Sequence, residues 1–327
     1  MEEKYSFEVM QRLQQAAHFD ETCPDRIRYK ESDYRLSPEA RVLNLAPSIR
    51  DLAGRYFDTK KITWHTHANH ALSSQVCCLN FLMPLAEHPD RLAHLVRTAL
   101  RSNDIEMLPV EEGPDQRPWY IGFEWNGGGR DFLNESAADG SLKRGSNSTS
   151  ADAVVRYRCA GHTEMLLIEW KYTEQYGAPI SVSGNPTRTQ RYGDLAFLPN
   201  GPIRADLGLT LADFFWEPFY QLIRQQMLAY QMQKAQVDGA TRVRVLHVSP
   251  LGNRALHRVT SSALRRFGND AFEVFQALLC ERGDFISWST EELFRPLIEA
   301  SALDDPWATY LLQRYRFLSE LEAAHLL

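Results

Sequence analysis

The chain has 327 residues and a formal net charge of −6, and 44% of its residues are hydrophobic. These values are typical of a globular protein that can bury a substantial core. The negative charge argues against broad, nonspecific binding of nucleic acid, although it leaves room for a local basic groove.

The sequence also argues against a membrane or secreted protein. No apolar run is long enough to cross a bilayer, and the acidic amino terminus is not followed by an apolar signal segment. The five cysteines are scattered, which fits a reducing compartment better than a disulfide framework. We therefore expect a cytoplasmic protein with no membrane segment.

The first part of the chain is predicted to be helical. Apolar residues recur at helical spacing over residues 5–19, and short helices are expected within residues 38–52 and 72–83. Another helix is predicted over residues 89–102, where leucines supply the apolar face.

Three histidines, His65, His67 and His70, precede the helix at residues 72–83. Imidazoles are common zinc ligands, so one interpretation is the metal site of a small-molecule hydrolase. The segment lacks an HExxH pattern and a nearby aspartate. We favour the interpretation that this is a polar segment that leads into the helix and lies near substrate phosphates.

A strand is predicted over residues 119–125, followed by a turn at the glycines 127–129. These glycines lack the Lys-Ser/Thr of a phosphate-binding P-loop, so a hairpin turn is the better interpretation. Residues 140–150 are rich in Gly, Ser and Asn and predict a loop that leads to Asp152.

Two β-rich runs, residues 153–158 and 165–172, flank a turn signal at Gly161. An antiparallel hairpin with this turn puts Asp152 across from residues 169–171, to within about one residue. Because strand side chains alternate, Glu169 and Lys171 share one face and Trp170 takes the other.

Two carboxylates and one ammonium therefore converge at one end of the hairpin. Carboxylates brought together repel each other unless a cation lies between them, and their oxygens suit Mg²⁺. A neighbouring lysine can stabilise charge on a phosphoryl group or orient a water molecule. The alternative is a solvated sheet edge with an ion pair between Glu169 and Lys171.

Asp152 and the run Glu169-Trp170-Lys171 resemble the signature of the PD-(D/E)XK nuclease superfamily, which has the restriction-endonuclease-like fold. The string Ile-Glu-Trp-Lys-Tyr-Thr-Glu at residues 168–174 is similar to the motif of a bacterial group of restriction endonucleases. The resemblance implies that Asp152, Glu169 and the carbonyl of Trp170 bind Mg²⁺. It also implies that Lys171 acts in DNA hydrolysis.

The superfamily often carries a further acidic residue on an earlier helix, and the helix around residues 75–83 has none. Glu124 and Glu135 are the two candidates to replace it. A site with only two acids is the alternative.

After the hairpin, residues 175–208 are predicted to be an irregular covering loop or insertion. A helix is then predicted over about residues 218–236, with Gln226 and Tyr230 one turn apart on an inward face. Some exonuclease-like branches of the superfamily carry Gln-x-x-x-Tyr on this helix. The resemblance therefore implies that Gln226 holds the water, the metal site or a phosphate, and Gln225 stays open as the relevant amide.

Residues 241–248 alternate as a strand, which a βαβ crossover would place beside the strand at residues 165–172. The chain from about residue 261 is predicted to be mostly helical. Its basic cluster predicts either phosphate contacts or a solvated helix face; the cluster contains Arg254, His257, Arg258, Arg265 and Arg266.

We predict an α/β fold with a central mixed sheet flanked by helices, in one domain over residues 1–327. Its restriction-endonuclease-like core spans about residues 62–250, between helical elaborations at 1–61 and 251–327. The expected function is Mg²⁺-dependent cleavage of DNA. Two alternatives remain open, an inactive nuclease-like module that binds nucleic acid or protein, and a metallohydrolase that uses the three histidines.

Overall fold

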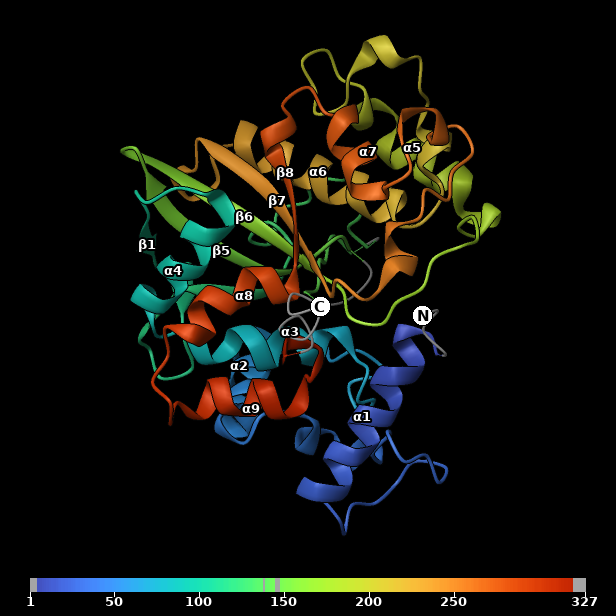
Figure 1. Ribbon diagram of the computed structural model, residues 1–327. Coiled ribbons are helices and arrows are strands. Elements are labelled where there is room, and N and C mark those ends of the chain that lie inside the picture. Colours follow the sequence, from blue (N-terminus) through green and yellow to red (C-terminus); the bar gives the residue numbers. More distant parts are fainter. Residues whose placement is uncertain (1–4, 138, 145–147, 320–327) are drawn as a thin grey trace, which may run out of the picture.

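The computed structural model describes residues 5–137, 139–144 and 148–319. It contains a central mixed sheet with helices on both faces, as the sequence predicts (Figure 1). The α-helices are α1 (Phe7–Thr22), α2 (Arg50–Lys60), α3 (Ser74–Leu82), α4 (Pro89–Leu100), α5 (Asn185–Ala196), α6 (Phe219–Lys234), α7 (Ala271–Leu278), α8 (Thr290–Glu299) and α9 (Pro306–Arg314). The strands are β1 (Glu106–Leu108), β2 (Glu111–Glu112), β3 (Pro118–Trp119), β4 (Ile121–Trp125), β5 (Ala151–Cys159), β6 (His162–Trp170), β7 (Arg242–Ser249) and β8 (Phe285–Ser289).

The central sheet has the strand order β1-β5-β6-β7-β8, and β4 also pairs with β5. Strands β1, β4 and β6 run antiparallel to β5, whereas β6, β7 and β8 are parallel. Helix α6 connects β6 to β7, which confirms the predicted crossover. Strands β2 and β3 form a separate small sheet.

The predicted hairpin is formed by β5 and β6. Ala160 and Gly161 make its turn with φ angles of 48° and 80°. This pair of positive φ angles matches the tight turns whose twist suits a hairpin. Because Ala153 pairs with Ile168, the next step along the hairpin brings Asp152 to Glu169.

Alternating side chains of the sheet build two separate cores. Val154, Leu167 and Val245 lie on the face covered by α5, α6 and α7. Val155 and Ile168 lie on the opposite face, which α2, α3, α4, α8 and α9 cover. A polar residue within a strand therefore has a defined side, because the core on each face fixes the register.

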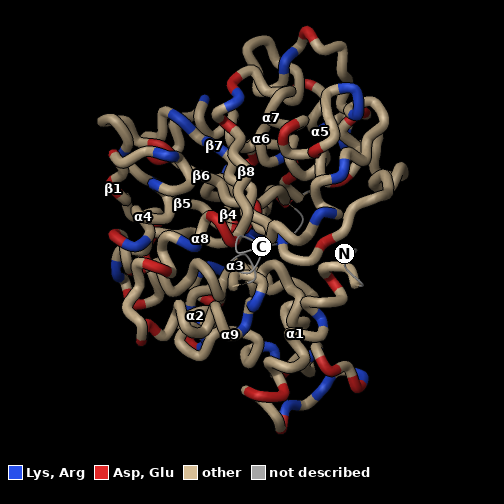
Figure 2. The backbone as a smooth tube through the Cα atoms, viewed as in Figure 1, with Lys and Arg blue, Asp and Glu red and all other residues tan. Residues whose placement is uncertain are grey.

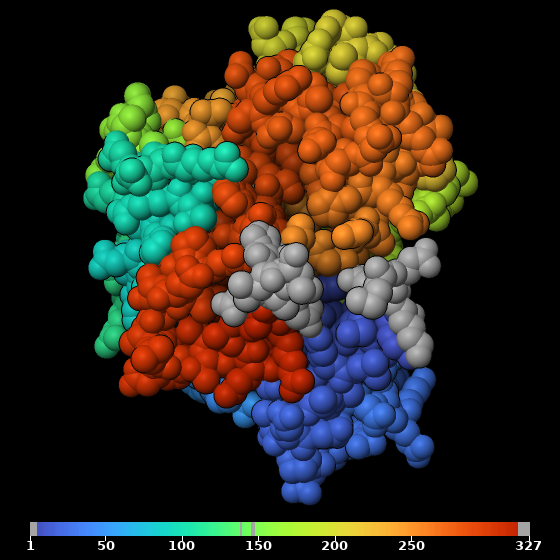
Figure 3. All heavy atoms as spheres, viewed as in Figure 1, coloured from blue at the N-terminus to red at the C-terminus, as the bar shows by residue number. Residues whose placement is uncertain are grey.

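The ends of the described chain pack together below the sheet. The side chains of Gln15 in α1 and Arg314 in α9 are linked, since the Arg314 Nε donates to Gln15 Oε1 at 3.0 Å. Tyr172, just after β6, donates from its hydroxyl to Gln11 in α1 at 2.8 Å. Figure 3 shows these amino-terminal and carboxy-terminal parts as neighbouring surfaces. Both therefore support the end of β6 that carries the predicted site.

The short strands β1, β2 and β3 are not predicted from the sequence, and two larger differences are α5 and β8. Helix α5 lies within residues 175–208, where an irregular segment is predicted; a proline in its first turn fits its start, but it buries only Tyr192 and Ala196. Strand β8 pairs with β7 beyond the predicted core boundary near residue 250. Both elements carry few apolar residues in a regular pattern, so periodicity gives them little signal.

Charged residues do not gather on one element of the described chain. Figure 2 shows Lys and Arg interspersed with Asp and Glu along the backbone. None of the helices in the described ranges is long and apolar enough to cross a membrane.

Candidate functional site

A row of polar residues crosses the sheet on the face of α6 and α7. Asp152 lies next to Glu169, Glu169 pairs with His247, and His247 pairs with Ser287. Residues directly opposite one another in a sheet project to the same face. The row therefore extends from β5 to β8.

Asp152 is held by the backbone of the neighbouring strand. The Trp170 N–H donates to Asp152 Oδ2 at 2.6 Å. Burial and then the charge of Glu169 raise the pKa of Asp152 well above its ordinary value, although Lys171 and the Trp170 hydrogen bond oppose this rise. The two carboxylates are thus close enough to repel each other.

Glu169 and Lys171 form an ion pair that is almost inaccessible to solvent, with exposed fractions of 1% and 8%. Burial is the largest influence on the pKa of Lys171 and acts to lower it, but Glu169 and the other acidic groups around it together raise the pKa well above its ordinary value. Lys171 is therefore a permanent cation beside the carboxylates. This geometry is not the solvated sheet edge that the sequence left as an alternative.

The amide that reaches the carboxylates belongs to Gln225, not Gln226. Gln225 Nε2 donates to Glu169 Oε2 and to the carbonyl of Ser150, both at 2.8 Å. Gln226 is also buried, and the Oε1 atoms of both amides lack a hydrogen-bond partner in the described part of the chain, so the Nε2 contacts of Gln225 make the difference. One helical residue is a rotation of about 100°, so only one of two neighbouring amides can face Glu169. Tyr230 lies one turn further along α6 and is only half-buried.

Of the two candidates for a further acidic residue, Glu124 lies in the electrostatic field of Asp152. Its charge contributes to the raised pKa of Asp152. Glu124 has a φ angle of 49° and interrupts the pairing of β4 with β5, since its neighbours Phe123 and Trp125 pair with β5 and Glu124 does not. Glu135 instead accepts a hydrogen bond from Thr149 Oγ1 at 2.7 Å and one from the hydroxyl of Tyr192.

The three histidines of the segment before α3 have different partners. His65 Nε2 lies 3.2 Å from Glu124 Oε1, and His67 Nδ1 lies 3.4 Å from a guanidinium nitrogen of Arg35. His70 Nδ1 accepts a hydrogen bond from the Leu72 N–H. Within the described ranges, no three His, Cys, Asp or Glu side chains lie together in an arrangement that could hold a metal ion. The structure thus gives no support to a zinc site made by this segment.

The donors around Asp152 and Glu169 suit a hard cation. Carboxylate oxygens are typical Mg²⁺ ligands, and Mg²⁺ commonly takes its other ligands from water and substrate phosphates. The raised pKa of Asp152 also fits, because a cation between the two carboxylates would offset the repulsion from Glu169, which is the second cause of the rise after burial. The Trp170 carbonyl is the further oxygen predicted from the sequence.

The chain matches the family described as Restriction Endonuclease associating with ARP over residues 11–316. It belongs to this family. The match confirms the resemblance to a restriction-endonuclease-like group and includes the amino-terminal and carboxy-terminal helices as well as the sheet. Searches of curated proteins and of solved structures return no match.

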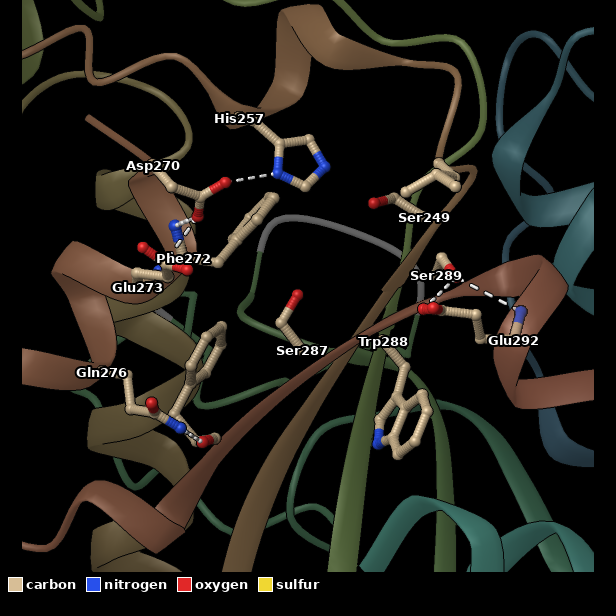
Figure 4. A pocket seen from close by; sticks show the side chains of 12 residues that line it. Ser249, His257, Asp270, Phe272, Glu273, Gln276, Ser287, Trp288, Ser289 and Glu292 are labelled. Carbon is tan, nitrogen blue, oxygen red and sulfur yellow. Dashed lines mark hydrogen bonds and ion pairs between the residues drawn. The ribbon is translucent and has the colours of Figure 1, made fainter. Parts of the chain in front are cut away.

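In this restriction-endonuclease-like chain, a cavity of about 270 Å³ lies at the other end of the polar row (Figure 4). Ser249, Ser287 and His257 point into it, and His257 Nδ1 lies 2.6 Å from Asp270 Oδ2. The lining also contains Glu273 and Glu292 in addition to Asp270. Three carboxylates make this cavity a poor place for a phosphate.

The cavity and its polar residues are not evident from the sequence. His257 is part of the basic cluster predicted to bind phosphate or solvent, yet its partner Asp270 is separated from it by a loop and caps α7. Arg265 and Arg266 donate to the carbonyls of Val259 and Leu207. Three members of the cluster therefore have structural partners within the chain.

Proposed function

We propose that the protein is a nuclease that hydrolyses DNA phosphodiester bonds with Mg²⁺ at Asp152, Glu169 and Lys171. The observation that carries this proposal is the hairpin register, which brings two carboxylates and one lysine together on one face. The family match over residues 11–316 supports it, because the family description names a restriction endonuclease.

Asp152 and Glu169, with the Trp170 carbonyl, would hold Mg²⁺. The bound ion would supply activation of a water nucleophile and stabilisation of charge on the phosphoryl group. Asp152 keeps its orientation because its Oδ2 is fixed by the Trp170 N–H. Its second oxygen is then the one directed to a ligand.

Lys171 serves as a cation rather than as a base. Burial acts to lower its pKa, but the combined charge of Glu169 and the neighbouring acidic groups raises the pKa above the ordinary value, so Lys171 keeps its proton at neutral pH. Its ammonium can donate to a phosphoryl oxygen and to the attacking water. The ion pair with Glu169 fixes where that ammonium lies.

Gln225 is a positioning residue. One oxygen of Glu169 pairs with Lys171 and the other accepts from Gln225, so neither oxygen rotates freely. Residues that orient a ligating carboxylate hold its geometry and basicity. Gln225 thereby connects α6 to the reacting end of the hairpin.

Cleavage of a DNA panel that contains linear, circular, double-stranded and single-stranded molecules tests the proposal. We expect Mg²⁺-dependent cleavage that a chelator stops and that Asp152→Asn abolishes. The matched control is Asp270→Asn, which changes a carboxylate at the far end of the polar row and should leave cleavage unchanged. Folded wild-type protein that cleaves no member of the panel would favour the inactive nucleic-acid-binding or protein-binding module.

A further inference from the structure

We propose that His65, held in place by Glu124 and Gln75, is a binding site for a substrate phosphate next to the scissile one. The inference rests on the proposed nuclease function. It assigns a role to a residue outside the Asp152–Glu169–Lys171 group, and this role differs from the zinc ligation considered for the three histidines.

The three side chains form a closed ring of hydrogen bonds. Gln75 Nε2 donates to Glu124 Oε1 at 2.6 Å, and the same oxygen lies 3.2 Å from His65 Nε2. The backbone N–H of His65 donates to Gln75 Oε1 at 3.0 Å, which closes the ring. Both the backbone and the imidazole of His65 are therefore positioned from the same two residues.

The members of this ring differ sharply in exposure. Gln75 and Glu124 are 3% and 5% exposed, whereas the His65 side chain is 41% exposed. The Gln75 amide and the Glu124 carboxylate are therefore too buried for a ligand to reach. The imidazole is the member of the ring that a ligand can reach.

The segment that carries His65 is also fixed on both sides. Trp64 stacks on Phe57 of α2 with ring centroids 4.0 Å apart. The carbonyl of His65 accepts from the Ala68 N–H at 3.0 Å. A preformed position of this kind reduces the ordering needed when a ligand binds.

Glu124 reaches the ring through an uncommon backbone conformation. Its φ angle of 49° is rare for a residue with a side chain, and such conformations gather at functional sites. The same residue is left out of the β4–β5 register. The distortion directs a carboxylate to His65 from a strand that otherwise contributes apolar residues to the sheet.

The charged groups that influence the pKa of His65 include Asp152 and Lys171 of the proposed nuclease site. Burial acts to lower the pKa of His65, but the hydrogen bond and charge of Glu124 raise it, with Asp152 adding to the rise and Lys171 opposing it. The net direction is upward, which favours the imidazolium. The strand register gives the same location, because Phe123 pairs with Ala153 and Trp125 with Ala151. Glu124, which lies 3.2 Å from His65 Nε2, is therefore across from Asp152 at the carboxylate end of the hairpin.

These features favour a phosphate contact over other roles. Histidine ligation of a metal is disfavoured because His67 and His70 have partners elsewhere. A general base is disfavoured because Nε2 is already engaged by Glu124. An exposed, oriented imidazolium donates instead to an anion, and the anions of a nucleic acid are its phosphates.

The test is the salt dependence of DNA binding in an Asp152→Asn background, which separates binding from cleavage. Each phosphate contact made by a cation adds about one to the slope of log K against log salt. We expect His65→Ala to reduce the magnitude of this slope by about one and His65→Arg to restore it. His67→Ala, two residues away, is the matched control and should leave the slope unchanged.

Melting temperatures of all variants accompany the titration, and the Arg variant tests charge even if His65→Ala destabilises the ring. An unchanged slope in folded His65→Ala overturns the phosphate contact while leaving the nuclease proposal in place. An equal reduction of the slope in His67→Ala also overturns the phosphate contact, because the effect would then not be specific to His65. A wild-type protein that neither binds nor cleaves DNA overturns the proposed function and this inference with it.

Discussion

The two ends of the polar row lie on the same face of the same sheet but have opposite character. Asp152, Glu169 and Lys171 are charged groups close to one another, and the pKa of Asp152 is raised first by burial and then by Glu169. At the other end, burial holds the pKa of His247 well below its ordinary value, so its ring is neutral. Its Nδ1 lies 3.2 Å from the Ser287 hydroxyl.

Open space and reactive groups therefore occur at different ends of this face. The Ser287 end has the cavity, yet its His247 ring stacks on Phe272 at 3.8 Å and serves packing. The Asp152 end has little exposed surface, yet it concentrates like charges that a cation would relieve. Perturbed charges in a confined place are the stronger indicator of a reaction site.

The largest effect on DNA cleavage is expected from a variant that disrupts the charged end of the polar row. Glu169→Gln should reduce DNA cleavage by about 10³-fold or more, because it removes a proposed metal ligand and the partner of Lys171. Single-turnover cleavage measures the effect, and circular dichroism checks the fold. Asp270→Asn in the far cavity is the control, and equal losses in both variants would contradict the distinction between the two ends.

A smaller effect separates the two neighbouring amides of α6. Gln225→Ala should reduce turnover by about 10- to 100-fold, because Glu169 loses the donor that orients it. Gln226→Ala should alter thermal stability without a selective loss of turnover. If the Gln226 variant loses more activity at equal stability, the assignment of the amide to Gln225 is wrong.

The neutral end predicts a dependence of stability on pH. The folded-state pKa of His247 lies below its unfolded value of about 6.5, so the unfolded chain binds the proton first as pH falls. The contribution of His247 is present above about pH 6.5 and is lost below it, by about 1.4 kcal/mol per pH unit. In denaturant unfolding, the free energy of unfolding of His247→Phe should therefore decrease less steeply below about pH 6.5 than that of wild type. An identical decrease of the free energy of unfolding with falling pH in both proteins would argue against a neutral, buried His247.

The hairpin and its site could be predicted because their signals are local. Apolar runs on either side of Gly161 fix the pairing, and side-chain alternation then places Glu169 and Lys171 on one face. The crossover strand at β7 follows from the helix before it. These features need only the spacing of residues close together in the chain.

The remaining features depend on contacts that spacing cannot show. Gln225 and Gln226 are both buried, and the helical period does not determine which of them meets Glu169. His65 and Glu124 are far apart in the sequence, and their contact depends on a positive φ angle within β4. Propensity gives no signal for such a conformation in a residue with a side chain.

Metal binding by the carboxylate pair is the central claim, and it can be measured without cleavage. Electron paramagnetic resonance with Mn²⁺ as a substitute for Mg²⁺ should detect binding by wild-type protein and by Asp270→Asn. We predict that Asp152→Asn, with its fold intact, loses this binding because one of the two acidic ligands becomes an amide. Mn²⁺ binding of the same strength in Asp152→Asn and wild type would contradict a metal site at Asp152 and Glu169.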